Sequence, residues 1–498
     1  MAKTFYTEHD VQDMVANKVS VLQLDNNIVL TMLAKETALK LGLQLIYDSP
    51  DAEAAPCRAP VQWPKNGAGN GPTGSAAELL QRRVRLLGEK APIFYDEPVH
   101  LVRGEGVWLY DADGKRYMDV YNNVPSVGHC HPHVVAALTR QARILNTHTR
   151  YLHKTIIEYG ERLTATLDES LSMVYFVCTG SEANELALRI ARQHTGGMGI
   201  IGTQATYHGN TAALFDLDTL FSAGVSMSPY VRTVPFPESY RPLLELSGVA
   251  LADAYVAEVQ AAIDAFAADG IKFAGLLVCP IFANEGLPDI PPGYWAKVAK
   301  TVHDAGGLLI FDEVQSGFGR TGKMWGYEST SVVPDIITMG KPMGNGHPLA
   351  GVVSREDIVT KFQDHAMYFN TFGGNPVSCE VGMAVLDVIE QENLVVNAAQ
   401  VGAYLASGLI KLKEKYDLIG DIRGRGLFFA VELVLDHNTK TPAPKETNRV
   451  VNMMKDRGIL ISKIGPHDNI LKMRPLLPFS HQNADQLLST LDDILATL

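Results

Sequence analysis

The chain has 498 residues, of which 46% are apolar and 20% charged, and its formal net charge is −12. This composition is typical of a globular protein with a large core, and it excludes a mostly disordered chain. No apolar run is long enough to predict a transmembrane helix, and no basic stripe indicates nucleic-acid binding. We therefore expect neither a membrane nor a nucleic acid as partner. The first ten residues are also too polar for a secretory signal.

The cysteines are few and scattered, and none forms a CxxC pair: Cys57, Cys130, Cys178, Cys279 and Cys379. This pattern predicts reduced thiols in the cytoplasm, with neither a disulfide framework nor a zinc site.

Residues 1–47 are predicted to form a small N-terminal helical module, because apolar residues from Val11 to Leu22 recur at helical spacing. A short apolar strand and a second helix are expected to follow within it. Residues 48–76 are rich in Pro, Gly and Ala and show no apolar period, which predicts a linker.

Strand and helix patterns alternate from residue 77 onward. Short apolar runs at 173–178, 275–279 and 307–313 predict buried strands, and amphipathic stretches at 184–193 and 291–305 predict helices between them. This alternation is typical of an α/β fold with a largely parallel sheet and helices on both faces.

Three segments carry residues that suit one chemistry. Residues 178–184 (CTGSEAN) follow a strand and open a helix, whose free N–H groups would bind a phosphate; an ordinary N-cap turn is the alternative. Asp312 ends a very apolar strand, where it would either pair with a protonated ring nitrogen or cap the next loop. Lys341 precedes a Gly-rich turn, where it would either form a Schiff base with an aldehyde or lie on the surface. Together the three meet the requirements of pyridoxal phosphate.

The order of motifs TGSEAN, YHG, FDEVQSGFGRTG, GKPMGNGHP and TFGGNP resembles the class III aminotransferases, which are fold-type I pyridoxal-phosphate enzymes. The resemblance covers residues 90–498. It implies a large cofactor-binding domain at 146–380, with a mostly parallel seven-stranded sheet flanked by helices. It also implies a smaller α+β domain built from residues 77–145 and 381–498.

The resemblance implies pyridoxal 5'-phosphate as cofactor and a role for each matching residue. Lys341 would bind the cofactor aldehyde and shuttle protons, and Asp312 would hold the ring nitrogen protonated. The other cofactor contacts would be Gly180 and Ser181 at the phosphate, Tyr207 and the adjacent His208 at the ring, Gln315 near the ring oxygen, and Thr371 from a neighbouring subunit. The contact from Thr371 implies a homodimer with shared sites, or a tetramer of two such dimers.

The run from Gly128 to His133 (GHCHPH) looks like a set of metal ligands. Its adjacent spacing matches neither helical nor finger-type metal sites, and in the family this motif is a loop-to-helix feature near the active site. We therefore expect no metal.

The substrate end departs from the pattern of family members that act on α-amino acids. Cys279 stands where these proteins often have a glutamate before proline, and Asn284 or Glu285 falls near the glutamate that masks their arginine. Lys472 occupies the position at which these proteins have the arginine that binds the substrate carboxylate. A lysine lacks the bidentate fork that grips a carboxylate, but it remains a good phosphate partner.

Several strings, among them SVGHCHPHVV, LNTHTRYLH and IGDIRGRGLF, resemble the ethanolamine-phosphate and phosphohydroxylysine phospho-lyases. This resemblance implies a 1,2-elimination that converts ethanolamine phosphate or 1-amino-2-propanol phosphate into an aldehyde, ammonia and phosphate. The candidate substrate residues are Arg150, Lys472, Arg423 and Asn123, with Arg474, Ser126 and His129 near the same entrance. For each basic residue, a surface or inter-subunit salt bridge is the alternative.

Two other functions stay open. One is an omega-aminotransferase that transfers an amine to pyruvate or 2-oxoglutarate. The other is a non-catalytic scaffold, which would have no need of Lys341. Residues 21–45 also resemble short segments of some bacterial microcompartment proteins, which implies a docking element; a helical extension that packs on the dimer is the alternative.

Overall fold

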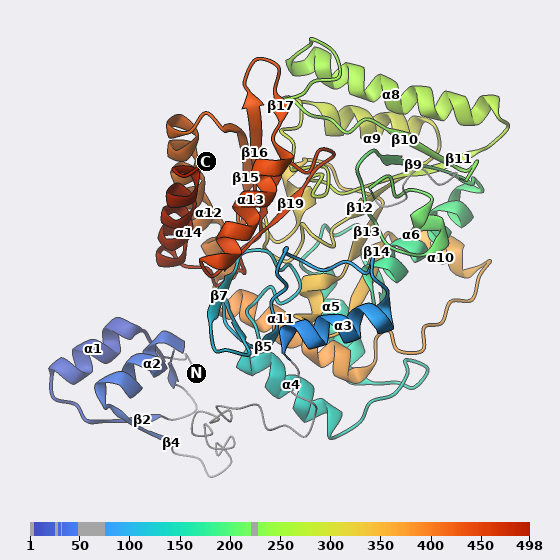
Figure 1. The fold of residues 1–498 in the computed structure, drawn as a ribbon. Coiled ribbons are helices and arrows are strands. Elements are labelled where there is room, and N and C mark those ends of the chain that lie inside the picture. The colour runs from blue at the N-terminus through green and yellow to red at the C-terminus, as the bar shows by residue number, and fades with distance from the viewer. Residues whose placement is uncertain (1–3, 25–27, 31, 48–74, 221–227) are drawn as a thin grey trace. The chain divides into compact units, whose positions relative to one another are not determined.

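The computed structural model describes residues 4–24, 28–30, 32–47, 75–220 and 228–498. The chain divides into two compact units, residues 1–81 and 82–498, which are described one after the other (Figure 1).

In its described residues the first unit is an α/β module, so the helical prediction for residues 1–47 is incomplete. Strands β1 and β3 pair in parallel, as do β2 and β4. Thr7 caps the first helix, and Asn17 and Lys18 end it, so Leu22 lies in a strand instead of continuing the helical face. The elements are β1 (Thr4–Tyr6), α1 (Glu8–Ala16), β2 (Val21–Leu24), β3 (Ile28–Leu30), α2 (Met32–Leu41) and β4 (Gln44–Tyr47).

Most of the predicted linker lies outside the described residues, since these resume at Ser75. The end of the predicted linker is helical. Helix α3 (Ala76–Leu87) starts with Ser75, whose hydroxyl accepts the Glu78 N–H at 3.3 Å and whose own N–H donates to the Glu78 carboxylate at 2.8 Å. The boundary between the two units falls inside this helix, after residue 81 and not at residue 76.

The second unit contains the predicted seven-stranded sheet, in the order β10-β9-β11-β12-β13-β14-β8. Only β14 runs antiparallel to its neighbours. The prediction of a mostly parallel sheet is therefore confirmed. The strands are β8 (Met173–Val177), β9 (Gly199–Thr203), β10 (Val231–Val234), β11 (Phe273–Val278), β12 (Leu308–Asp312), β13 (Ile336–Met339) and β14 (Ala350–Ser354).

Both faces of this sheet are buried, because alternate residues of one strand belong to different cores. On β12, Leu309 and Phe311 pack with helices α8 and α9, whereas Leu308 and Ile310 pack with α6 and α10. The helices of this part are α4 (Pro132–Ala142), α5 (Lys154–Thr164), α6 (Gly180–Thr195), α7 (Ala212–Phe215), α8 (Gly248–Ala268), α9 (Tyr294–Asp304), α10 (Glu356–Gln363) and α11 (Pro376–Gln391).

The second unit has two smaller sheets, one built of late strands alone (β15-β16-β20-β19, with β17 on β16) and one that combines early and late strands (β18-β7-β6-β5). Strand β18 pairs in parallel with β7, which joins the C-terminal region to the hairpins before the large sheet. The contact pattern keeps these segments in one unit with the large sheet. The strands are β5 (Leu101–Glu105), β6 (Trp108–Asp111), β7 (Arg116–Asp119), β15 (Ile419–Arg425), β16 (Phe428–Asp436), β17 (Thr441–Pro442), β18 (Ile459–Leu460), β19 (Ser462–Ile464) and β20 (Ile470–Met473).

Helices α12 (Leu394–Lys415) and α13 (Pro444–Asp456) pack on these sheets, and α14 (His481–Leu495) packs on the two helices. In the described part of the chain, α12 alone is long and apolar enough to cross a membrane by length and composition. One face of α12, with Val401, Leu405 and Leu409, is buried in the main core of this unit. Its apolar character is therefore accounted for by packing.

Candidate active site

The site lies where the carboxyl ends of the parallel strands meet at one edge of the sheet. A cavity of 220 Å³ opens there, the usual position for a ligand in an open α/β sheet. Residues from the ends of β8, β9, β11, β12 and β13 line it: Gly180, Ser181, Tyr207, His208, Gly209, Cys279, Asn284, Asp312, Val314, Gln315 and Lys341.

One wall of the cavity is the N-terminus of α6. Thr179 caps this helix, and the Glu182 carboxylate accepts the backbone N–H of Thr179 at 2.9 Å. The first-turn N–H groups at Gly180 and Ser181 thus stay free to bind an anion. Gly209 has φ +146°, and a Cβ on it would lie 2.7 Å from the Ser181 hydroxyl. Only glycine leaves this cradle open.

Asp312 is fixed by three donors at the end of β12. Its Oδ2 lies 2.7 Å from His208 Nδ1 and accepts the Asn184 amide at 2.9 Å, and its Oδ1 accepts the Val314 N–H at 2.9 Å. Burial alone would raise the pKa of Asp312, but the hydrogen bond and charge of His208, with Lys341, lower it overall. The carboxylate is therefore held ionised where it meets the cavity.

Lys341 follows β13 at the start of a short 3-10 helix, η3 (Lys341–Gly344), with φ +31°. A positive φ in a residue with a bulky side chain is strained and often marks a functional site. Burial lowers the pKa of Lys341, and the Asp312 carboxylate opposes that shift. A larger fraction of such an amine is unprotonated near neutral pH, and this is the form that attacks an aldehyde or accepts a proton.

Two cations from β20 and the residue after it approach the cavity behind Gln315. Lys472 Nζ donates to Gln315 Oε1 at 3.3 Å and to Asn284 Oδ1 at 3.5 Å. Arg474 donates to the same Gln315 oxygen at 2.5 Å, and its guanidinium lies 4.6 Å from the Tyr121 ring centre.

Both cations are buried, and within the described ranges neither forms an ion pair with a carboxylate. Burial, with the charges of Arg474 and Lys341, lowers the pKa of Lys472 well below its usual value. Burial also lowers the pKa of Arg474, whose Nε has no hydrogen-bond partner. Neither residue lines the cavity itself; both lie behind Gln315, which does, and we call this pair of cations the second wall. Unpaired buried cations are costly, so the second wall is suited to an anion.

Of the other predicted substrate residues, Asn123 lies beside this wall. Its amide donates to the Gln315 carbonyl at 3.1 Å, and its buried Oδ1 has no partner. Ser126 accepts a hydrogen bond from the buried Arg320 at 3.4 Å. Neither Asn123 nor Ser126 is among the residues that line the cavity.

Arg423, also predicted to bind substrate, is engaged by carboxylates in the structure and does not line the cavity. Its guanidinium is buried and pairs with Glu432 at 2.7 Å and with Asp421 at 3.1 Å. It faces the same side of the sheet as Lys472, since both are in register with Ala430. Glu432 lies two residues along β16 on that face and binds Arg423.

Arg150 and Thr371 are exposed and do not line the cavity of their own chain. The Arg150 guanidinium lies 4.2 Å from the ring centre of Phe369, so the two segments that carry these residues are neighbours. Their role stays a prediction that depends on a second subunit.

The histidines of GHCHPH each meet a different carboxylate. His129 lies 2.8 Å from Asp119, and His131 and His133 lie near Glu392 and Asp387. Among the described residues, no three His, Cys, Asp or Glu side chains gather as metal ligands. The four cysteines among the described residues have free thiols: Cys130, Cys178, Cys279 and Cys379.

Several functional residues were missed by sequence reasoning. Asn184 lies inside the TGSEAN motif and donates to Asp312, while Thr338 donates to Asn184 at 2.6 Å. The side chains of Asn284 and Glu285 point in different directions. Asn284 lines the cavity, whereas the Glu285 carboxylate is buried and accepts a hydrogen bond from the Thr203 hydroxyl at 2.7 Å. Their adjacency in the sequence gave no signal for which of them faces the cavity.

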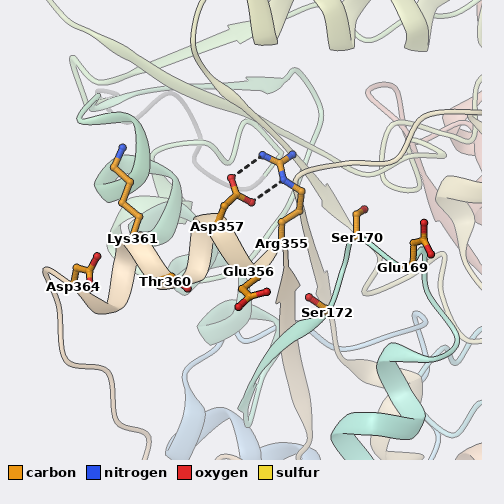
Figure 2. A pocket seen from close by; sticks show the side chains of 9 residues that line it. All are labelled: Glu169, Ser170, Ser172, Arg355, Glu356, Asp357, Thr360, Lys361 and Asp364. Carbon is orange, nitrogen blue, oxygen red and sulfur yellow. Dashed lines mark hydrogen bonds and ion pairs between the residues drawn. The ribbon is translucent and has the colours of Figure 1, made fainter.

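A second hollow of 740 Å³ lies elsewhere on the second unit, beside the start of α10 (Figure 2). Its walls are polar, and Arg355 is engaged there by Asp357 and, outside the view, by Asp335. This open hollow leaves no buried charge unpaired.

The arrangement fits a pyridoxal-phosphate enzyme. A helix N-terminus with an obligatory glycine would hold a phosphate, an ionised aspartate would hold a pyridinium nitrogen, and a lysine of lowered pKa would react with an aldehyde. A model of the aminotransferase class-III family matches residues 94–495. The chain belongs to this family, and its cofactor is pyridoxal 5'-phosphate.

Known proteins similar to this chain have both activities that the sequence left open. "Alanine–glyoxylate aminotransferase 2 homolog 2, mitochondrial" of Arabidopsis thaliana is 41% identical over 84% of the chain and 88% of its own length. "Ethanolamine-phosphate phospho-lyase homolog 1" of Caenorhabditis elegans is 37% identical over 85% of the chain and 94% of its own. A solved phospholyase from Arthrobacter, in complex with phosphoethanolamine, is 46% identical with a TM-score of 0.82 over 84% of this chain and all of that one. The chain is thus a PLP-dependent lyase or aminotransferase.

Proposed function

We propose that this enzyme is a phospho-lyase that eliminates phosphate from a small amino-alcohol phosphate. The observation that carries the proposal is the pair of buried cations, Lys472 and Arg474, beside the cavity without a carboxylate partner. A phosphate dianion would supply the missing negative charge. The start of α6 would hold the cofactor phosphate, so the cations behind Gln315 are left for the substrate.

The kinds of donor at the second wall support a phosphate over a carboxylate. Lys472 is a point charge and lacks the planar fork of an arginine, whereas phosphate accepts hydrogen bonds in many directions. Similarity to the Arthrobacter phospholyase, whose structure contains phosphoethanolamine, supports the same substrate class.

Each side chain has a defined task in this reaction. The cofactor, when bound, withdraws electrons from the carbon that bears the substrate amine. Lys341 Nζ takes the proton from that carbon, and Asp312 keeps the ring nitrogen protonated through its fixed carboxylate. Lys472 and Arg474 hold the phosphate on the next carbon as it leaves with the bonding electrons. Elimination leaves an enamine, and its hydrolysis by water gives the aldehyde and ammonia beside the released phosphate.

An omega-aminotransferase is the second candidate. The observation in its favour is the 41% identity to the Arabidopsis alanine–glyoxylate aminotransferase homolog. Such an enzyme would use the same Lys341 and Asp312 but would bind a keto-acid carboxylate at the second wall.

We propose a homodimer as the active form. Exposed apolar side chains gather on the two neighbouring segments that carry Arg150 and Thr371; Leu152 and Met367 are 101% and 93% exposed. A second copy that covers this surface would bring Thr371 to the cofactor phosphate of its partner and Arg150 to the partner's substrate.

The test is release of phosphate and ammonia from ethanolamine phosphate and from 1-amino-2-propanol phosphate, with no keto acid present. Equal release of both products supports the lyase. No release of phosphate or ammonia from either substrate, together with amine transfer to pyruvate or 2-oxoglutarate, would establish the aminotransferase instead.

A further inference from the structure

The side chain of Gln315 lies between the cavity and the second wall. Gln315 lines the cavity, whereas Lys472 and Arg474 do not. Its Oε1 accepts a hydrogen bond from Arg474 at 2.5 Å and another from Lys472 at 3.3 Å. A phosphate inside the cavity therefore meets this amide before it meets either cation.

The oxygens that face the second wall are neutral. Lys472 donates to Gln315 Oε1 and, at 3.5 Å, to Asn284 Oδ1, and both are amide oxygens that balance no charge. A phosphate oxygen in the place of Gln315 Oε1 would add the attraction between opposite charges, which is strong where water is excluded. Exchange of the amide oxygen for a phosphate oxygen is therefore favourable.

The two cations have contacts that do not depend on this amide. The Arg474 guanidinium lies 4.6 Å from the ring centre of Tyr121 and 5.5 Å from that of Phe428. Lys472 Nζ lies 5.6 Å from the same Phe428 ring centre. Cations are attracted to aromatic rings at such distances. An anion that displaces the amide would thus find both cations already in position.

The amide of Gln315 is free to turn on a fixed backbone. The Asn123 amide donates to the Gln315 carbonyl at 3.1 Å and holds the backbone there. Gln315 Nε2 donates to Asn284 Oδ1 at 2.9 Å, and Asn284 Nδ2 donates to the Tyr207 carbonyl at 3.0 Å. The last torsion of a glutamine side chain has broad minima, so it turns at little cost. Asn284 Oδ1 keeps Lys472 as a donor after such a turn.

We propose that Gln315 is a specificity-determining residue whose side-chain oxygen holds the place of a phosphate oxygen on the second wall. A phosphorylated substrate displaces this oxygen from Arg474 and Lys472, whereas an amine without a phosphate leaves it there. The inference rests on the proposed phospho-lyase function, and it adds how the substrate reaches cations that do not line the cavity. A singly charged carboxylate offsets less of the lost hydrogen bonding, so Gln315 disfavours it.

The test measures the binding of inorganic phosphate to the holoenzyme, because the bound cofactor keeps a second phosphate away from the start of α6. Isothermal titration calorimetry gives the affinity of the wild type and of three variants. Gln315→Glu keeps the side-chain shape but puts a carboxylate on the cations, Gln315→Ala removes the oxygen, and Lys472→Met removes one cation. Circular dichroism and cofactor absorbance show that each variant is folded and loaded.

The two changes at position 315 should act in opposite directions. Gln315→Glu should weaken phosphate binding about tenfold or more, because its carboxylate already balances the cations and repels the ligand. Gln315→Ala should strengthen binding by roughly threefold or more, because no oxygen has to be displaced. An unchanged or weaker affinity in Gln315→Ala would overturn the inference, since Gln315 would then not compete with phosphate.

Lys472→Met separates this inference from the proposed function. If the wild type binds no phosphate, or if Lys472→Met binds it equally well, the second wall is not a phosphate site and both proposals fail. If Lys472→Met loses phosphate while both Gln315 variants keep the wild-type affinity, only the inference on Gln315 fails.

A crystal structure of the wild-type holoenzyme with phosphate gives an answer that needs no variant. Phosphate on Arg474 and Lys472, with Gln315 Oε1 turned away from both, would support the displacement. A bound phosphate beside a Gln315 Oε1 that still accepts the Arg474 hydrogen bond would overturn it.

Discussion

Replacement of Lys472 by methionine separates the stability of the protein from its function. Methionine has a similar volume, and no acceptor loses its last donor, because Gln315 keeps Arg474 at 2.5 Å and Asn284 keeps Gln315 at 2.9 Å. Replacement of buried charged groups by well-packed apolar side chains is often neutral or stabilising by about 1–4 kcal/mol, and removal of Lys472 leaves no partner charge behind. We expect Lys472→Met to raise the melting temperature of the cofactor-free protein by about 1–5 °C, given the size of the second unit.

The same substitution should damage the reaction. A charge-assisted contact to a phosphate that forms in the transition state is worth roughly 2–4 kcal/mol, which corresponds to a loss of about 30- to 1000-fold in kcat/KM. The loss should appear with amino-alcohol phosphates and be absent with amines that carry no phosphate. The assays are phosphate release under steady-state conditions and thermal unfolding of the same preparations.

The stability gain should depend on pH. Because the pKa of Lys472 is lowered in the folded protein, the unfolded chain binds its proton more tightly. The wild type therefore gains stability as pH rises from that lowered pKa toward the usual value of 10.5. The advantage of Lys472→Met is largest at the acid end of this window and disappears above it.

Lys455→Met is the matched control, since Lys455 is also buried but pairs with Asp456 at 2.7 Å. It should gain no stability and keep the wild-type kcat/KM. A Lys472→Met enzyme that loses stability, or that loses less than about threefold in kcat/KM with phosphorylated substrates, would refute the reasoning. A loss confined to transfer to pyruvate would point to a carboxylate site.

Three further outcomes are expected. Lys341→Ala abolishes turnover in either reaction but leaves the fold intact, as measured by product release and circular dichroism; residual turnover above about 1% would contradict its role as proton carrier. Gly209→Ala places a Cβ 2.7 Å from the Ser181 hydroxyl and should weaken binding of pyridoxal phosphate about tenfold or more. Binding of pyridoxal, which has no phosphate, should change little. Fluorescence titrations measure both affinities. Burial raises the pKa of Glu313 to about 7, so the wild type loses stability as pH rises from 4.5 to 7. Glu313→Gln should be less stable than the wild type at pH 5 and should approach it at pH 8, as measured by denaturant titrations. A stability difference that widens with pH would contradict this.

Much of the active site could be predicted from the sequence because its residues follow strands. Gly180, Asp312 and Lys341 each come after an apolar run, and parallel strands deliver such positions to one edge of the sheet. Segments 160 residues apart therefore meet without any long-range signal in the sequence. The two short motifs YHG and DEVQ add Tyr207, His208 and Gln315 in the same way.

Features that depend on side-chain direction could not be predicted. Arg423 faces the same side as Lys472, but Glu432 on the next strand binds it, and only the register reveals that contact. Asn284 and Glu285 are adjacent in the loop after β11, and only the folded backbone shows that Asn284 faces the cavity. The strands of the first unit are three or four residues long, too short for an alternating pattern to stand out.

The charged groups around the cavity divide into those that the cofactor needs and those that it does not need. The cofactor needs one phosphate-binding wall, one carboxylate and one amine, and the start of α6, Asp312 and Lys341 provide them. Lys472 and Arg474 are surplus to that set, and their burial costs stability in the free protein. A fold retains such a cost where a ligand removes it, and a phosphorylated substrate that brings two negative charges close to these cations would do so. The same attraction would be weaker for a singly charged carboxylate, which is the physical reason to favour elimination of phosphate over amine transfer.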